Sequence, residues 1–394
     1  MNNMTTKIQD GNIIVYLSGR IDSTNSPDIE KELIEDVERS GGAVPVFDMS
    51  DLSYISSAGL RVLMRIRKNS EDALKVVNVS SEIYEIFDTT GLTELFDVSK
   101  KMREISVDGC EIIGKGFYGT VYRIDDDTIV KAYESADSLS MIQNEKKLAK
   151  IALVAGVPTA ISYDIVRIGD SYGSVFELLR AKTFNDLLIE QPENSESIIK
   201  KYAEFLRLIH SRVVPPGRLV SAKEKFMKYL EVASVYLPAD IYSKVKAMFE
   251  EIPELHNVIH GDAQMKNVML GDGEPMLIDM DTLSEGHPIF DLQSLYVTYF
   301  AFGEDNPDNS RTFLGISNEL VANIWERSIG YYFGTDDEKR ISELRDKISV
   351  AGCIRFLFLI DGMGEYEKEL FDIRVKHTVE HLQDLLTRVD TLLF

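Results

Sequence analysis

Two short polar clusters in the second half of the chain constrain its fold and chemistry more than any other feature. The first reads HGDAQMKN at residues 260–267, and the second reads LIDMD at residues 277–281. Each follows a short apolar run, which predicts a buried strand that ends in a polar loop. Asp262, Asn267 and Asp279 would then place two carboxylates and an amide at neighbouring strand ends. Phosphoryl transfer from a magnesium nucleotide needs this set, because one carboxylate orients the hydroxyl group and an amide–carboxylate pair holds the metal.

A glycine-containing loop lies upstream between two predicted strands. Residues 111–122 read EIIGKGFYGTVY, with Gly114, Gly116 and Gly119 in the loop. Glycines let backbone N–H groups approach phosphates without interference from a Cβ atom. Lys131 ends the next apolar strand, a position from which an ammonium group can reach the α- and β-phosphates of a nucleotide.

Glu145 lies on the predicted helix that follows and is the expected ion-pair partner of Lys131. A lone G-x-G-x-x-G pattern is a weak indication of phosphate binding, since a glycine loop between strands is more often a plain turn. The order of glycine loop, strand lysine, helical glutamate, HGD cluster and second acidic cluster is a strong indication of a kinase-like fold.

Residues 111–394 resemble the aminoglycoside phosphotransferase and choline kinase superfamily, the small-molecule branch of the protein-kinase-like fold. The resemblance implies an α+β bilobal domain, with a β-rich N-lobe at residues 110–180 and a helical C-lobe at residues 181–394. It also implies ATP and Mg²⁺ as cofactors and a hydroxyl group as the phosphate acceptor.

The same resemblance implies a role for each residue of the site. Asp262 would be the catalytic base, and Asn267 and Asp279 would bind the magnesium ion. Lys131 and Glu145 would form the pair that anchors the phosphates. The other cofactor-binding positions are the loop glycines and the hinge whose backbone would receive the adenine, namely Gly114, Gly116, Gly119, Glu177 and Leu179.

A protein kinase fits the sequence less well than a small-molecule kinase. Gln264 stands where serine/threonine kinases have a lysine, and no long activation segment with an A-P-E closure separates Asp279 from Asp291. Asp281 and Asp291 match acidic positions of the small-molecule family, with less certain roles. The helical lobe would set the acceptor specificity, and its acidic candidates are Asp281, Glu285, Asp361, Glu365 and Glu367.

The first hundred residues alternate predicted strands and helices, which indicates a small α/β domain. Residues 47–60 read FDMSDLSYISSAGL, similar to the signature of STAS domains, the fold of anti-sigma-factor antagonists. The resemblance implies a STAS-like domain at residues 1–105 and an anti-sigma factor or related protein as its partner. Ser57 aligns with the serine that a partner kinase phosphorylates in that family, although Ser56 stands where many relatives have Asp. The alternative is that both serines only cap the following helix.

Composition limits the classes of partner and compartment. The net charge of −22 argues against nucleic acid and anionic membranes as partners, and it weakly favours a cationic small molecule. Two cysteines, Cys110 and Cys353, form no disulfide framework and indicate a reducing cytoplasm. The sequence predicts neither a signal peptide nor a membrane span. His377 and His381 are four residues apart, and without a third ligand nearby they predict a surface helix rather than a metal site.

Two other functional interpretations stay open at this level. The kinase-like part could sense nucleotide without catalysis, in a regulator of the anti-sigma-factor-antagonist type. It could also phosphorylate Ser57 of its own chain.

Overall fold

The chain divides into two compact units. The computed structural model describes residues 3–9, 11–41, 43–68, 70, 73–115, 119–135, 137–271, 273–363 and 368–394. The first unit comprises residues 1–106 with 166–169, and the second comprises residues 107–165 with 170–394. Each unit has its own hydrophobic core.

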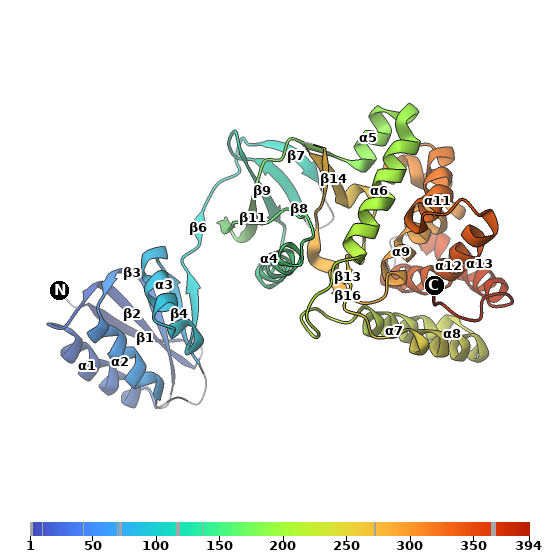
Figure 1. Cartoon of the computed structure of the whole chain (residues 1–394). Helices are drawn as coiled ribbons and strands as arrows, with labels where there is room; N and C mark the ends of the chain where they lie inside the picture. Colours follow the sequence, from blue (N-terminus) through green and yellow to red (C-terminus); the bar gives the residue numbers. More distant parts are fainter. Residues whose placement is uncertain are drawn as a thin grey trace. The chain divides into compact units, whose positions relative to one another are not determined.

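The first unit is the α/β domain that the sequence predicts. Its sheet has the order β1-β2-β3-β4-β5, in which β1 is antiparallel to β2 and the other pairs are parallel. Helices α1 and α2 lie side by side along the sheet (Figure 1). Val15, Phe47 and Val76 of the strands are fully buried in the core. The elements are β1 (Met4–Gln9), β2 (Asn12–Ile21), α1 (Ser26–Arg39), β3 (Val44–Ile55), α2 (Ser57–Lys68), β4 (Leu74–Val79), α3 (Ser81–Thr89), η1 (Leu92–Glu94), β5 (Phe96–Lys100) and β6 (Arg103–Glu104).

The second unit begins with a β-rich part. Its strands include β11, β9, β8 and β7 in that order, and the pairs β7–β8, β8–β9 and β9–β11 are antiparallel. Residues 166–168 at the end of β10 belong to the first unit. Helix α4 packs beside β11 (Figure 1). The elements are β7 (Glu111–Lys115), β8 (Gly119–Arg123), β9 (Thr128–Tyr133), α4 (Leu139–Val154), β10 (Asp164–Ile168) and β11 (Ser171–Glu177).

The rest of the second unit is mainly helical, as expected for a kinase-like fold, so the predicted fold class is confirmed. Its helices are α5 (Phe184–Glu190), α6 (Ser195–His210), α7 (Ala222–Ala233), α8 (Ala239–Glu251), α9 (Ile289–Tyr296), α10 (Phe302–Glu304), α11 (Asn318–Phe333), α12 (Glu338–Met363) and α13 (Lys368–Leu385). Short 3-10 and π segments are η2 (Pro192–Asn194), η3 (Ser234–Tyr236), η4 (Met265–Asn267), η5 (Met280–Thr282), η6 (Val297–Ala301) and η7 (Ser310–Leu314). Within the described ranges, no helix is both long enough and apolar enough to span a membrane.

Two small sheets within the helical part carry the polar clusters. One has the order β12-β14-β15, and the other pairs β13 with β16. Strand β13 ends directly before the HGD cluster, and β15 ends directly before the second acidic cluster. The strands are β12 (Ala181–Thr183), β13 (Val258–Ile259), β14 (Val268–Gly271), β15 (Glu274–Leu277) and β16 (Ser284–Glu285).

Candidate active site

The loop after β13 holds Asp262 between two amide side chains. Asn267 Nδ2 donates to the Asp262 backbone oxygen at 2.8 Å and to its Oδ2 at 3.0 Å. Gln264 Nε2 donates to both carboxylate oxygens of Asp262, at 3.2 and 3.1 Å. Burial raises the pKa of Asp262, although the His260 charge and the Gln264 hydrogen bond act in the opposite direction. The carboxylate is therefore oriented and more basic than an ordinary aspartate.

Asp291, on α9, anchors the backbone of this loop from beneath. Its carboxylate accepts the backbone N–H groups of His260 and Gly261, each at 2.9 Å. It also contacts His210 Nε2 at 2.9 Å, while His210 Nδ1 lies 2.7 Å from the Tyr332 hydroxyl. Burial alone would raise the pKa of Asp291, but these hydrogen bonds outweigh it and lower the pKa below the ordinary value. Asp291 thus has a positioning role that the sequence left uncertain.

The glycine of the HGD cluster is required by its backbone. Gly261 has a φ of +89°, a conformation that side chains with a Cβ rarely adopt. A Cβ at this position would also lie 2.9 Å from the Thr282 carbonyl oxygen. The loop therefore packs closely against the segment that follows the second cluster.

Lys131 lies in contact with its predicted partner Glu145 and also with Asp279. Its Nζ is 2.7 Å from Asp279 Oδ1 and 3.6 Å from Glu145 Oε1. Burial opposes the charge of Lys131, but the two carboxylates outweigh it and raise its pKa above the ordinary value. Tyr133 donates its hydroxyl to Glu145 Oε2 at 2.7 Å. The sequence analysis did not identify Tyr133, although it lies two residues after Lys131 on the same face of β9.

Asp279 occupies an unusual backbone conformation. Its φ is +64° and its ψ is 68°, a left-handed conformation that aspartate tolerates better than most residues. Its side chain is 41% exposed, so it is accessible to a ligand. Asp281 is partly buried nearby, and burial together with the charges of Asp279 and Glu145 raises its pKa to about 6.

This group of side chains suits a magnesium ion. Because Asn267 Nδ2 is occupied by two hydrogen bonds to Asp262, the amide oxygen Oδ1 is the atom left for a metal. Asp279 uses Oδ1 for Lys131, which leaves Oδ2. Hard carboxylate and amide oxygens are the ligands that Mg²⁺ prefers. Burial is the main cause of the raised pKa of Asp262 and Asp281, and the charge of Asp279 adds to it in both cases. A divalent cation would neutralise this local negative charge.

The three loop glycines have different environments. A Cβ on Gly119 would lie 2.0 Å from the Ala132 carbonyl oxygen, so this glycine allows β8 and β9 to approach each other. A Cβ on Gly114 would meet Val121 only at 3.7 Å, an ordinary contact. Gly116 lies outside the described residues. Packing thus explains the glycine at position 119 but not the one at position 114.

The predicted hinge follows β11. Glu177 is exposed and pairs with Thr128 of β9 at the end of the sheet. Leu178 donates its backbone N–H to Asp127 O at 2.7 Å, so this N–H group is not available to bind the adenine. Adenine recognition through the backbone of Glu177 and Leu179 stays a prediction.

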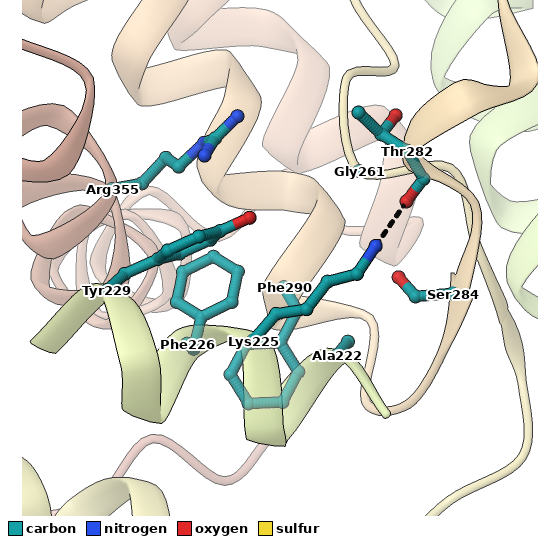
Figure 2. A pocket seen from close by; sticks show the side chains of 9 residues that line it. All are labelled: Ala222, Lys225, Phe226, Tyr229, Gly261, Thr282, Ser284, Phe290 and Arg355. Atoms are coloured by element: carbon teal, nitrogen blue, oxygen red, sulfur yellow. Dashed lines mark hydrogen bonds between the residues drawn. The ribbon is translucent and has the colours of Figure 1, made fainter. Parts of the chain in front are cut away.

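A small pocket adjoins the loop that carries Asp262. Its cavity volume is about 20 Å³, which is room for a group about the size of one water molecule. Gly261 and Thr282 form one wall, and α7, α9 and α12 contribute the other walls (Figure 2). The lining residues are Ala222, Lys225, Phe226, Tyr229, Gly261, Thr282, Ser284, Phe290 and Arg355. No motif of the sequence indicated Lys225 or Arg355, because both residues lie within helices that carry no recognisable functional pattern.

The acidic residues expected to contact the acceptor do not line this pocket. Glu285 is buried and accepts the N–H of Gly217 at 3.1 Å and contacts His256 Nδ1 at 3.0 Å. Its carboxylate is therefore used within the fold, which corrects the expectation for that residue. Asp361 is exposed and accepts the hydroxyl of Tyr236. Glu365 and Glu367 lie outside the described residues.

In the first unit, Ser56 rather than Ser57 caps α2. Ser56 Oγ accepts the N–H groups of Ala58 at 3.2 Å and Gly59 at 3.4 Å. Ser57 is the first residue of the helix and is exposed. The capping alternative thus accounts for Ser56 and leaves the Ser57 hydroxyl accessible.

The two histidines of α13 each contact a carboxylate from α10 or the residue after it. His377 Nδ1 lies 2.6 Å from Asp305 Oδ1, and His381 Nε2 lies 2.6 Å from Glu304 Oε1. Carboxylates thus lie near these histidines, and Glu304, Asp305 and His377 are close enough together to hold an ion, which the sequence did not indicate. The expectation of a surface helix rather than a metal site stays a prediction. Hydrogen bonds from the two histidines to these carboxylates account for the contacts without a metal.

Comparison with known proteins gives two family matches. Residues 3–105 match the STAS domain, and residues 109–315 match the phosphotransferase enzyme family. The anti-sigma-B factor antagonist of Bacillus subtilis is 31% identical over 102 residues, which cover 25% of this chain and 92% of that protein.

Solved structures with a similar chain path are less similar in sequence. A choline/ethanolamine kinase family protein from Mesorhizobium loti has a TM-score of 0.46 and 17% identity, covering 70% of this chain and 87% of that one. The ADP-bound aminoglycoside phosphotransferase APH(2'')-Ib has a TM-score of 0.47 and 14% identity, covering 78% and 99%.

Proposed function

Because the chain belongs to the phosphotransferase enzyme family and carries a STAS domain at residues 3–105, we propose that it is an ATP- and Mg²⁺-dependent kinase of a small molecule. The acceptor's hydroxyl oxygen attacks the γ-phosphorus of ATP, and the bond from that phosphorus to the β-phosphate oxygen breaks. ADP leaves, and the hydroxyl proton passes to Asp262. The raised pKa of Asp262 supports this role, because it brings the base closer to neutral pH.

The observation that carries the proposal is the convergence of four distant positions. Lys131 Nζ lies 2.7 Å from Asp279 Oδ1, and Asn267 Nδ2 lies 3.0 Å from Asp262 Oδ2. The backbone also joins the two clusters, since the Ile278 N–H donates to Asn267 O at 3.0 Å. A base, an amide, a second carboxylate and an ammonium group are thus available around one reacting phosphoryl group.

Each remaining residue has a role in the same reaction. Asn267 and Asp279 would hold Mg²⁺, which supplies charge neutralisation for the phosphates when bound. Lys131, held by Glu145, would bind the α- and β-phosphates. Gly114 and Gly116 would cover the phosphates with backbone N–H groups, Gly119 would set the approach of β8 to β9, and the backbone of Glu177 and Leu179 would bind the adenine.

The STAS domain would bind a protein partner of the anti-sigma-factor type, and Ser57 would be its phosphorylation site. The exposed position of Ser57 at the N-terminus of α2 supports this, because the positive end of the helix dipole there favours a phosphate. Mass mapping after incubation with labelled ATP tests modification by the chain itself. An unmodified Ser57 peptide would exclude that variant of the proposal.

An acceptor screen with ATP and Mg²⁺ tests the proposed reaction. Replacement of Asp262 by Asn should lower phosphoryl transfer by about 10²- to 10⁴-fold, because proton acceptance is lost. The affinity for ADP·Mg²⁺ and the circular dichroism spectrum should stay close to those of the wild type. Undiminished transfer by the variant would contradict the mechanism, whereas ATP binding without turnover of any acceptor by the wild type would favour the nucleotide-sensing regulator.

A further inference from the structure

The pocket beside Asp262 presents two cations. Lys225 enters from α7, and its Nζ donates to the Thr282 carbonyl oxygen at 2.9 Å. Arg355 enters from α12, with its guanidinium 4.7 Å from the ring centre of Tyr229 and 5.4 Å from that of Phe358. Figure 2 shows both side chains extending toward the segment with Gly261 and Thr282.

The pocket lining contains no carboxylate to neutralise these charges. In the part of the chain that the structure describes, neither Lys225 nor Arg355 has an ion-pair partner within 4.0 Å. Burial and the charge of Arg355 lower the pKa of Lys225, while Asp281 acts weakly in the opposite direction. Two cations held near each other with no carboxylate in direct contact favour binding of an anion.

The position of the pocket ties it to the acceptor rather than to the nucleotide. Gly261 directly precedes Asp262, and Thr282 lies three residues after Asp279. The Arg355 charge is also close enough to Asp262 to lower the pKa of that carboxyl, against the larger effect of burial. A group bound between Lys225 and Arg355 would therefore lie near the hydroxyl that Asp262 orients.

We infer that the acceptor is a small hydroxyl compound that carries a carboxylate or phosphate group, which Lys225 and Arg355 bind. This inference rests on the proposed phosphotransferase function and names the substrate class of that site. A cationic acceptor, which the net charge weakly favoured, would meet two like charges in this pocket, because nearby charges outweigh distant ones in salt solution.

Four compounds that share one diol test the inference with the full chain and ATP·Mg²⁺. They are glycerate, glycerol phosphate, neutral glycerol and cationic 3-amino-1,2-propanediol. One of the two anionic compounds should have a kcat/KM at least about tenfold above that of glycerol, because charge-assisted hydrogen bonds are the stronger ones. The preferred anion distinguishes carboxylate from phosphate. Preference for the neutral or cationic compound would overturn the inference.

Variants test which residues bind the anionic group. Lys225→Met and Arg355→Met should each raise the KM for the anionic acceptor by about tenfold to a hundredfold, with an unchanged KM for ATP. Arg355→Lys should restore part of the affinity. Lys228→Met is the matched control, because Lys228 is exposed on the same helix and does not line this pocket. An unchanged acceptor KM in both Met variants would contradict the assignment.

A direct binding measurement separates this inference from the proposed function. Crystals saturated with ADP·Mg²⁺ and soaked in selenate should show an anomalous peak between Lys225 Nζ and the Arg355 guanidinium. Absence of that peak with ADP bound would overturn the anion site. If selenate binds there but no acceptor and no water receives the γ-phosphoryl group, the anion site stands and the phosphotransferase proposal fails.

Discussion

At the scale of single residues, the chemistry depends on how Asp262 is held. Gln264 donates to both of its carboxylate oxygens, which stabilises the charged form. The catalytic base must be deprotonated, so activity should fall as the pH drops through the raised pKa of Asp262. This acid limb should lie above the range of an ordinary aspartate.

Replacement of Gln264 by Leu tests that arrangement. Loss of the two hydrogen bonds should raise the pKa of Asp262 further and move the acid limb of kcat/KM to higher pH. The plateau rate should change by no more than about tenfold, since the base itself remains. Lys266→Met serves as the control, because Lys266 is on the same loop but donates to Phe313 O. If the acid limb of kcat/KM stays at the same pH in the Gln264 variant, these two hydrogen bonds do not control the pKa of Asp262.

The negative charge of Asp281 lowers the free energy of unfolding of the unliganded protein. Its pKa rises from 3.8 to about 6 on folding, so the folded state binds the proton more tightly than the unfolded state. Stability therefore falls as the pH rises from about 4 to about 6, and the full penalty remains above that range. Asp281→Asn should stabilise the second unit by about 1–2 kcal/mol at pH 7.5, a value reduced for partial solvent screening.

Thermal unfolding at two pH values measures this effect. The stabilisation by Asp281→Asn should become small at about pH 3, below both pKa values, where Asp281 is mostly protonated in both states of the wild type. Asp126→Asn is a suitable control, because the Asp126 side chain is fully exposed. A stabilisation that persists unchanged at about pH 3 would arise from something other than the charge.

At the scale of elements, the packing of β8 against β9 requires a glycine at position 119. Within the described part of the chain, no packing constraint requires the glycine at position 114, so we expect its role to be in phosphate binding. Gly119→Ala should destabilise the fold by about 2–4 kcal/mol, because the new Cβ would overlap the Ala132 carbonyl oxygen. Gly114→Ala should change stability by less than about 1 kcal/mol but raise the KM for ATP. Melting temperatures and ATP titrations of the two variants separate packing from phosphate binding, and an unaltered KM in Gly114→Ala would remove Gly114 from the phosphate site.

The elements also show what the sequence could and could not reveal. Short apolar runs before Asp262 and Asp279 predicted the strands that end at the site, because buried strands and polar loops leave local patterns. Lys225 and Arg355 left no such pattern, since α7 begins at Ala222 and α12 only at Glu338. Arg355 also lies deep within a 26-residue helix. Glu285 misled the analysis because a buried carboxylate that binds backbone N–H groups looks the same in sequence as an exposed one.

At the scale of the whole molecule, the two hydrophobic cores share no residues. Calorimetry of the full chain should therefore show two thermal transitions. ADP·Mg²⁺ at about a hundred times its dissociation constant should stabilise only the kinase-like unit, by about 2.7 kcal/mol. A single transition that shifts as a whole would show that the two units unfold together.

The central claim is that Asp262, Asn267, Asp279 and Lys131 surround one nucleotide phosphoryl group. A crystal structure of the full chain with a nonhydrolysable ATP analogue and Mg²⁺ tests it most directly. The metal should lie about 2.1 Å from Asn267 Oδ1 and from the Asp279 carboxylate, with the γ-phosphate facing Asp262. Lys131 Nζ should move from Asp279 toward the phosphates. A triphosphate bound elsewhere, or a metal held by other residues, would contradict the account.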